Sequence, residues 1–240
     1  MKKAIIPTIV ALSMPLTAQA AEWNYSASLY GWFPGLDSTI GTAFGDLDMD
    51  ISAQDLISNL DMAFMGTFEG HNGQWGYLAD IFYSDISTNK TGPFGFVSAD
   101  LDLKLTLVSL AATYRVSETA TSQVDLMGGL RGYDMDVGGQ FNGGGNPTFG
   151  GSDKWVDPVI GLRGRWALSD QWSLTALGDV GGFGLGSDLS WQVLATFDYA
   201  LNDSWLLRFG YRHLEVDKPI NGRDVQVGLS GPIFGATYRF

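Results

Sequence analysis

Residues 23–33 of the chain read WNYSASLYGWF, and this stretch decides the fold. Its odd-numbered positions are aromatic, apolar or glycine, whereas Asn24, Ser26 and Ser28 are polar. Successive side chains of a β-strand point to opposite sides, so a period of two is typical of a strand with one apolar and one polar face. The stretch therefore predicts an amphipathic strand.

The same phase recurs in stretches that begin at residues 75, 172 and 205, and each of these opens on tryptophan after a short polar break. Strands that run into such breaks end on aromatic residues of the same face. Aromatic rings gathered at one level are typical of the interface between a membrane and water. The pattern predicts an aromatic girdle formed by Trp23, Trp75, Trp166, Trp172, Tyr199 and Trp205.

The breaks between strands alternate between short polar turns and longer segments rich in Gly, Asp and Asn. Short periplasmic turns and longer outer loops are the arrangement of bacterial outer-membrane barrels, which have an even number of strands. We therefore predict an all-β fold, a closed antiparallel transmembrane β-barrel of about ten strands. The expected strands are 23–33, 61–70, 75–86, 99–115, 123–133, 154–168, 172–181, 190–200, 205–217 and 225–240.

Two of these strands change phase along their length. Apolar residues are odd-numbered up to Leu107 and even-numbered from Val108, which predicts a β-bulge near Leu107. A similar shift is expected around Gly231–Pro232 in the last strand. Residues 34–60 are expected to form an outer loop, in which residues 53–60 form a short helical turn.

A soluble β-sandwich or lipocalin-like barrel also alternates, but it places the apolar face inside. Here the polar face carries too many charges for a dry core, and we expect it to line a lumen inside a lipid-facing wall. Leu78, Phe82, Tyr30 and Trp32 also point inward and are expected to narrow the outer half of the lumen. The predicted lumen charges are Asp61, Glu69, Asp80, Arg115, Asp125, Arg131, Asp157, Arg163, Arg165, Asp179, Asp198, Arg208, Arg212 and Arg239.

The first residues have the pattern of a secretory signal peptide: two lysines, an apolar segment from Ala4 to Leu16, and Ala18-Gln19-Ala20. We expect a signal peptide at 1–20, a barrel at 21–240, and Sec-dependent export through the periplasm to the outer membrane. The 240-residue chain has no cysteine and a formal net charge of −12. Such an acidic protein is a poor candidate for nucleic-acid binding, and no motif predicts a cofactor.

The chain ends Gly235-Ala236-Thr237-Tyr238-Arg239-Phe240, and the positions of Gly235, Tyr238 and Phe240 resemble the signal recognised by the bacterial barrel-assembly machinery. The stretch GDVGGFGLGSDLSWQ at 178–192, with residues 155–158 and 210–212, resembles a group of small, uncharacterised outer-membrane barrel proteins. The resemblance implies fold and location, and it carries no activity. Expected partners are outer-membrane lipid and lipopolysaccharide, with the assembly machinery and periplasmic chaperones during biogenesis.

For function, the sequence favours a non-enzymatic barrel, either membrane-structural or a narrow passive channel for small solutes. The alternative is a surface protein whose acidic outer loops bind divalent cations, lipopolysaccharide or a partner. A lipid-modifying enzyme that uses His213 with Glu215 and Asp217 is a weaker hypothesis, because His213 has lipid-facing parity. We predict no catalytic and no metal-binding residue.

Overall fold

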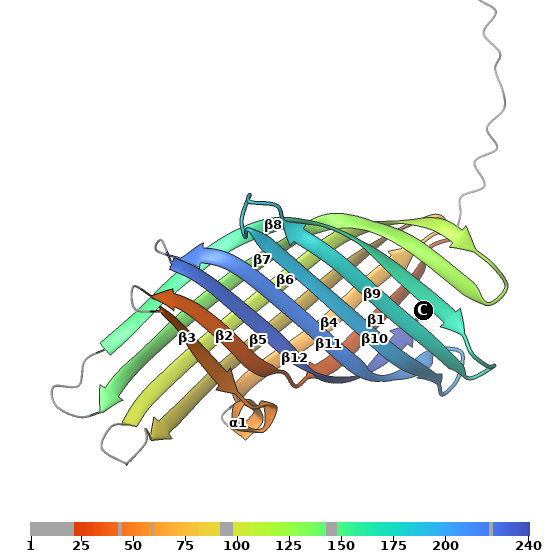
Figure 1. The fold of residues 1–240 in the computed structure, drawn as a ribbon. Coiled ribbons are helices and arrows are strands. Elements are labelled where there is room, and N and C mark those ends of the chain that lie inside the picture. Colours follow the sequence, from red (N-terminus) through yellow and green to blue (C-terminus); the bar gives the residue numbers. More distant parts are fainter. Residues whose placement is uncertain (1–21, 43–44, 59, 92–97, 143–147, 221–222) are drawn as a thin grey trace, which may run out of the picture.

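The protein is a closed antiparallel β-barrel, here a computed structural model that describes residues 22–42, 45–58, 60–91, 98–142, 148–220 and 223–240 (Figure 1). The predicted signal peptide, residues 1–20, lies outside the described residues. Ten strands follow one another around the barrel, and the first pairs with the last. The predicted fold class is confirmed. The barrel strands are β1 (Asn24–Trp32), β4 (Leu60–His71), β5 (Trp75–Thr91), β6 (Ser98–Glu118), β7 (Ser122–Asn142), β8 (Thr148–Ala167), β9 (Trp172–Gly182), β10 (Leu189–Ala200), β11 (Trp205–Ile220) and β12 (Arg223–Arg239).

Closing a sheet into a barrel requires the strands to tilt and their register to shift around the circumference. The shift can be followed from Ser26 of β1 through paired residues on every strand to Val227 of β12, whose partner is Ser38. Ser38 lies twelve positions beyond Ser26 in the same chain segment. The outer half of β12 therefore extends beyond the end of β1 and pairs with a different strand.

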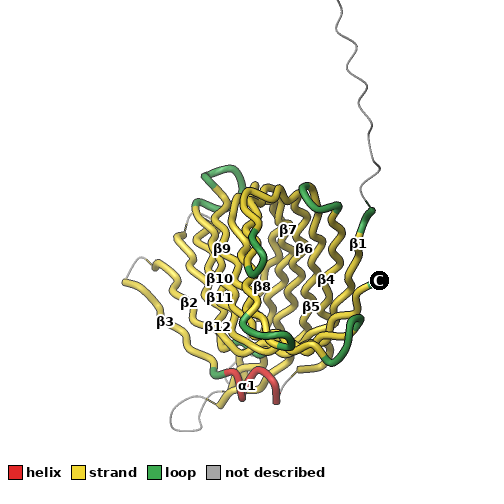
Figure 2. Tube along the Cα trace, turned by 90° about the vertical axis from the view of Figure 1, so that its right-hand side faces the viewer, coloured by secondary structure: helices red, strands yellow, loops and turns green. Residues whose placement is uncertain are grey.

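That partner is a hairpin of β2 (Gly35–Thr42) and β3 (Gly45–Ile51), followed by the short helix α1 (Ala53–Ser58). β2 pairs with β12 over residues 35–40 and 225–230, and β3 pairs with β2. Figure 2 shows the hairpin leaning away from the rest of the barrel, with α1 at its foot. The predicted outer loop at 34–60 is thus wrong for most of its length, although a helical turn does begin at Ala53.

The polarity of the wall inverts along the longest strands. Toward the short turns, outward side chains are apolar and exposed, as Leu110, Leu130 and Ile160 are, while inward ones are charged. Toward the outer end, β6 turns Lys104 outward and buries Leu107. A wall that is apolar outside faces lipid, and a wall that is polar outside faces water. The barrel therefore extends beyond the membrane as a water-exposed sheet with an apolar interior.

Charged residues of the water-facing part pair directly across neighbouring strands. Lys104 lies opposite Asp85, with Nζ 2.9 Å from the carboxylate, and Lys154 lies opposite Asp134 at 2.7 Å. The hydrogen bond from Lys104 to Asp85 raises the pKa of the lysine, which keeps it charged. Such exposed pairs add little stability, but they mark where the wall leaves the lipid.

The polarity inversion explains two wrong predictions. No bulge occurs near Leu107, because the pairing of β6 with both neighbours runs through that residue without a shift. No shift occurs at Gly231–Pro232 either, since β12 pairs continuously with β11 there. In both strands the outward face passes from lipid to water, while alternate residues continue to point to the same side of the wall. The register shifts that do occur in β6 and β4 lie at Arg115/Ser117 and Leu60/Met62.

The inversion also explains why several strands are longer than predicted. The predictions for β5, β7 and β8 end near the point where apolar residues leave the outward face, whereas these strands continue outward, β7 to a length of 21 residues. The prediction for β6, 99–115, already included this part, and the strand is longer by one residue there and by three at the short turn. A tilted membrane-spanning strand needs only about 9–11 residues. The additional length stands outside the lipid.

We expect Leu110→Arg to lower the free energy of unfolding in lipid vesicles by about 2–4 kcal/mol, because it places a charge in the lipid-facing belt. Asp102→Arg, which is outward on the same strand but in the water-facing part, should change it by less than about 1 kcal/mol. Denaturant titration of both variants in the same vesicles measures the difference. Equal effects would contradict the position of the lipid boundary.

Candidate functional site: the barrel interior

The lower part of the lumen, toward the short turns, contains a network of buried ion pairs. Arg163 contacts both Glu69, at 2.8 Å, and Asp125, at 2.9 Å. Arg165 contacts Glu69 and Arg115 contacts Asp125, each at 2.5 Å. These five side chains, the lower charge layer, come from β4, β6, β7 and β8, so the layer joins strands that are not neighbours in the barrel. Buried carboxylates shared between guanidinium groups remain charged because each has a partner.

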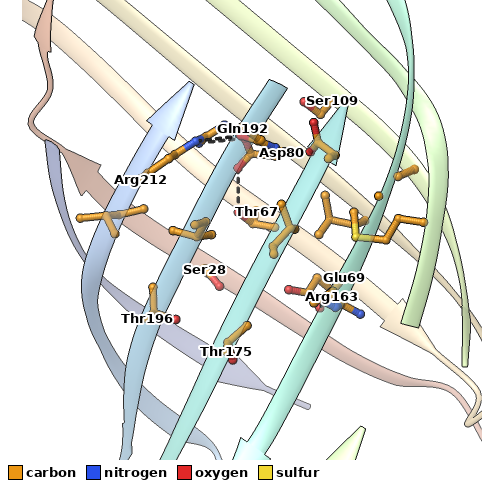
Figure 3. A pocket seen from close by; sticks show the side chains of 18 of the residues that line it. Ser28, Thr67, Glu69, Asp80, Ser109, Arg163, Thr175, Gln192, Thr196 and Arg212 are labelled. Atoms are coloured by element: carbon orange, nitrogen blue, oxygen red, sulfur yellow. Dashed lines mark hydrogen bonds and ion pairs between the residues drawn. The ribbon is translucent and has the colours of Figure 1, made fainter. Parts of the chain in front are cut away.

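A chain of polar side chains crosses the lumen further outward (Figure 3). Gln192 donates to Asp179 at 2.6 Å and accepts from Arg212 at 2.8 Å. Tyr30 donates to Asp80 at 2.7 Å and accepts from Arg212 at 3.2 Å. We call this set, completed by Arg131, the upper polar chain; Arg131 contacts Asp179 at 2.8 Å.

The outer part of the lumen is filled by apolar and aromatic side chains. Along a strand, the next inward-facing residue on the outer side of a polar one is apolar or aromatic. Trp32 follows Tyr30, Phe82 follows Asp80 and Leu214 follows Arg212 in this way. Trp32 and Leu214 are each only 2% exposed, so both are almost completely covered by their neighbours. We call this set the apolar plug: Trp32, Met65, Phe82, Leu107, Tyr133, Leu214, Val216, Leu229 and Ile233.

A cavity of about 100 Å³ lies in the middle of the lumen, between the lower charge layer and the apolar plug. One water molecule needs roughly 10–15 Å³ on the same measure, so the cavity has room for several. Glu69 and Arg163 line one part, and Asp80, Gln192 and Arg212 line another (Figure 3). The arrangement can hold water and small polar molecules, but among the described residues no path through the plug connects it to the outside.

The structure places nine of the predicted lumen charges in these networks and four of them, Asp157, Asp198, Arg208 and Arg239, elsewhere. Asp198 is buried and accepts from Thr175 at 2.7 Å, with Arg208 3.4 Å away. Asp157 is fully buried at the edge of the plug. Arg239 is exposed at the rim, and the side chain of Asp61 lies outside the described residues.

A hydrogen-bonded turn at 182–188 is a feature that the sequence analysis missed. Its Ser187 amide donates to Asp157 at 2.7 Å, and the Trp155 indole donates to the Ser187 hydroxyl at 2.8 Å. Lys218 donates to the carbonyl of Gly186 at 3.1 Å. Two stretches quoted for the family resemblance, 155–158 and 178–192, are thus joined by contacts, which was not visible from their spacing in the sequence.

The aromatic residues predicted as a girdle face outward at the end of the short turns. Five are tryptophans that are 37–57% exposed, and Trp172 also packs on Tyr199. At the C-terminus, Phe240 packs against Tyr25 and exchanges backbone hydrogen bonds with it, each of 2.9 Å. The three residues of the expected assembly signal, Gly235, Tyr238 and Phe240, therefore also close the barrel between β12 and β1.

His213 is on the outward face, where its Nδ1 lies 2.5 Å from the Ser230 hydroxyl. Its Nε2 is 3.6 Å from Glu215, which is too long for a hydrogen bond. Both His213 and Ser230 sit within paired strands whose amides are used in the ladder, so these residues offer no free amides to stabilise an oxyanion. The cluster fits a polar patch at the membrane interface better than a hydrolytic site.

Comparison with known proteins finds similarity in fold only. No protein-family model and no curated protein matches the chain. The outer-membrane protease OmpT from Escherichia coli matches with a TM-score of 0.60 and 12% identity, over 92% of this chain and 98% of that one. The translocator domain of the autotransporter NalP from Neisseria meningitidis matches with a TM-score of 0.45 and 12% identity, over 94% and 91%. Ail of Yersinia pestis matches with 0.39 and 13%, over 91% and 98%.

At 12% identity the OmpT match shows that the chain has the fold of an outer-membrane β-barrel, and nothing about activity. The described residues contain no helix long and apolar enough to cross a bilayer. They also contain no group of three or more histidine, cysteine, aspartate or glutamate side chains that could hold a metal ion. The resemblance to the group of small barrels stays a prediction.

We expect Arg163→Met to lower the free energy of unfolding by about 3–5 kcal/mol, because it leaves Glu69 and Asp125 buried without their shared partner. Arg239→Met is the matched control, since it removes the same side chain at an exposed position and should cost less than about 0.5 kcal/mol. Denaturant titration in vesicles measures both. If the two variants were equally stable, the lower charge layer would not hold the barrel together.

Proposed function

We propose that the protein is an integral, non-enzymatic barrel of the bacterial outer membrane whose lumen is closed, and that its role is membrane-structural. The observation that supports this is the apolar plug: nine inward side chains, each less than 10% exposed, fill the outer half of the lumen. Small barrels are commonly filled by their own side chains rather than open. The buried ion pairs beneath the plug add a second obstacle to ions.

The channel function that the sequence also allowed is less favoured. A narrow passive channel needs a continuous polar path, whereas at this level of the described lumen the inward side chains are apolar or aromatic, and Trp32, Leu107 and Leu214 are each only 2% exposed. A solute would have to displace close-packed side chains at this level.

Location and biogenesis belong to the same proposal. The fold, the exposed apolar belt and the aromatic girdle support insertion into the outer membrane after Sec-dependent export, with periplasmic chaperones and the barrel-assembly machinery as partners. Outer-membrane lipid and lipopolysaccharide would surround the belt. The side of the outer membrane from which the longer strands project follows from the short turns, which we assign to the periplasm.

The water-facing extension supports a second candidate, a surface-binding protein. The hairpin and α1 carry Asp37, Asp46, Asp48, Asp50 and Asp55 and no lysine or arginine. A chain segment with this excess of negative charge attracts cations and basic partners. Deleting the hairpin should abolish such binding, which can be measured with whole cells.

We expect the refolded mature protein to give no discrete conductance steps in a planar bilayer, because the plug excludes water from the outer lumen. A heat-modifiable shift in gel migration shows that the sample is folded, and a general porin in the same bilayer is the positive control. Discrete steps from the folded wild-type protein would overturn the closed lumen and favour the passive channel.

A further inference from the structure

The turn at 182–188, between β9 and β10, lies part-way along the barrel and not at its outer end. β9 ends at Gly182 and β10 begins at Leu189, whereas the neighbouring β11 continues outward to Ile220. Figure 1 shows the turn, in blue-green beside the β8 label, standing out from the wall, with the outer ends of β5, β6 and β7 further along the barrel. The turn is therefore a lateral feature of the wall.

The height of the turn relative to the lipid is given by β8, against which it lies. A Cβ at Gly186 would be 2.5 Å from the carbonyl oxygen of Val156. Val156 is 53% exposed and is the outermost apolar residue on the outward face of β8. The next outward residue, Lys154, is charged and pairs with Asp134 on β7. The turn thus lies at the level where the wall passes from lipid to water.

The side of the turn that faces the barrel is polar and hydrogen-bonded. Ser187 is fully buried, its amide donates to Asp157 at 2.7 Å, and its hydroxyl accepts from the Trp155 indole at 2.8 Å. Within the turn, the amide of Gly184 donates to the carbonyl of Ser187 at 3.0 Å. These bonds fix the backbone of the turn on the outer part of the wall.

The opposite side of the turn is apolar. Phe183 and Leu185 are 53% and 80% exposed, and Leu185 is the most exposed large apolar residue in the described part of the chain. Val156 and Leu189, which border the turn on the outward face, are 53% and 43% exposed. The exposed apolar surface of the turn is therefore continuous with the lipid-facing belt, and leaving it in water would be unfavourable.

The backbone conformation of Phe183 is a further sign that its ring has a role outside the turn. Its φ is 52°, and among the described residues it is the only one other than glycine with a positive φ. Gly182 and Gly184 on either side have φ values of 88° and 72°. This left-handed region suits glycine and disfavours a bulky side chain. Glycine at 183 would serve the turn geometry better, so the exposed ring needs a partner beyond the turn.

We propose that the turn is a lateral membrane anchor, which inserts Phe183 and Leu185 among the acyl chains of the outer leaflet just below the head groups. Lipid is the partner because the apolar surface continues the lipid-facing belt at its outer edge. Burial of both side chains in hydrocarbon is favourable, while the polar side of the turn stays on the barrel. The proposal rests on insertion of the barrel into the outer membrane and is independent of whether the lumen is closed.

Such an anchor complements the aromatic girdle. The girdle lies at the end of the short turns, where its tryptophans are suited to the periplasmic interface. The turn at 182–188 lies at the opposite edge of the belt, on the side formed by β8 to β11. Together the two contacts would fix the height of this side of the barrel in the membrane.

The test uses the full-length mature protein refolded in vesicles of dilauroylphosphatidylcholine. The chain has no cysteine, so a single introduced cysteine carries one nitroxide spin label. Leu185→Cys reports the turn, Ile160→Cys the lipid-facing belt and Lys154→Cys the water-facing wall. Power saturation compares collisions with oxygen, which concentrates in hydrocarbon, and with a nickel chelate, which stays in water. We expect the oxygen-to-nickel ratio at Leu185 to be several-fold higher than at Lys154 and close to that at Ile160.

The three labels also separate the anchor from insertion of the barrel. In urea-unfolded protein without lipid, the three ratios should be equal, which controls for the label itself. A ratio at Leu185 equal to that at Lys154, with a high ratio at Ile160, would overturn the anchor alone and leave the two side chains free for a protein partner. A low ratio at Ile160 as well would overturn both membrane insertion and the anchor.

A second pair of variants tests the role of the Phe183 ring. Phe183→Asn, made in the Leu185→Cys protein, removes the ring and suits the left-handed backbone, so the ratio at Leu185 should fall toward that at Lys154. Phe64→Asn is the matched control, because Phe64 is also 53% exposed but lies on β4, away from the turn. It should leave the ratio unchanged. Equal effects of the two substitutions would overturn the assignment of Phe183 to the anchor.

Discussion

The structure depends on one constraint: the same β-wall passes through two solvents. Within the lipid, outward side chains must be apolar, so charged residues such as Glu69 and Arg163 are placed inside, where they can only be stable as pairs. Outside the lipid the hydrophobic effect acts in the opposite direction, and apolar residues such as Leu107 and Leu214 move to the interior. The lumen is charged at one end and apolar at the other for this reason.

The sequence was sufficient to predict the parts of the wall that lie in lipid. There the period of two, the tryptophans that open strands and the arginines and carboxylates on the opposite face all agree, and the strand cores and the closed barrel follow from them. It was insufficient where the solvent changes. At Leu107 the apolar residues change parity while the backbone does not, and a reading based on apolar periodicity alone converts that change into a bulge. The correct prediction keeps even-numbered residues of this strand outward on both sides of the lipid boundary. Lys104, an even-numbered charged residue, is the signal that the outward face has become polar.

The hairpin at 35–51 escaped prediction for a different reason. Its composition of glycine and aspartate is typical of a loop, and this composition outweighed the alternation of Leu47, Met49 and Ile51 with aspartates, which is that of a strand. It becomes a strand because the register shift around the barrel leaves the outer half of β12 without a partner, and a paired backbone is more stable than an exposed edge. This requirement arises only when the ten strands are assembled. The partner of each lumen charge also depends on the assembled barrel and could not be predicted. Glu69 and Arg163, for example, are 94 residues apart in the sequence and meet across the lumen.

The barrel wall is interrupted at two places, between β1 and β4 beyond Leu29 and Gly66 and between β8 and β11 beyond the ends of β9 and β10, and the ladders end differently there. Between β8 and β11, the turn at 182–188 replaces the missing strand pairs with hydrogen bonds from Ser187 and Asp188, and the fully buried Asp157 accepts one of them. Between β1 and β4, beyond Leu29 and Gly66, the Trp32 amide donates to the thioether sulfur of Met65 at 3.0 Å. Because a thioether is a weak acceptor, the ladder is held less strongly at this end than beside the turn at 182–188, where a carboxylate and a backbone carbonyl are the acceptors.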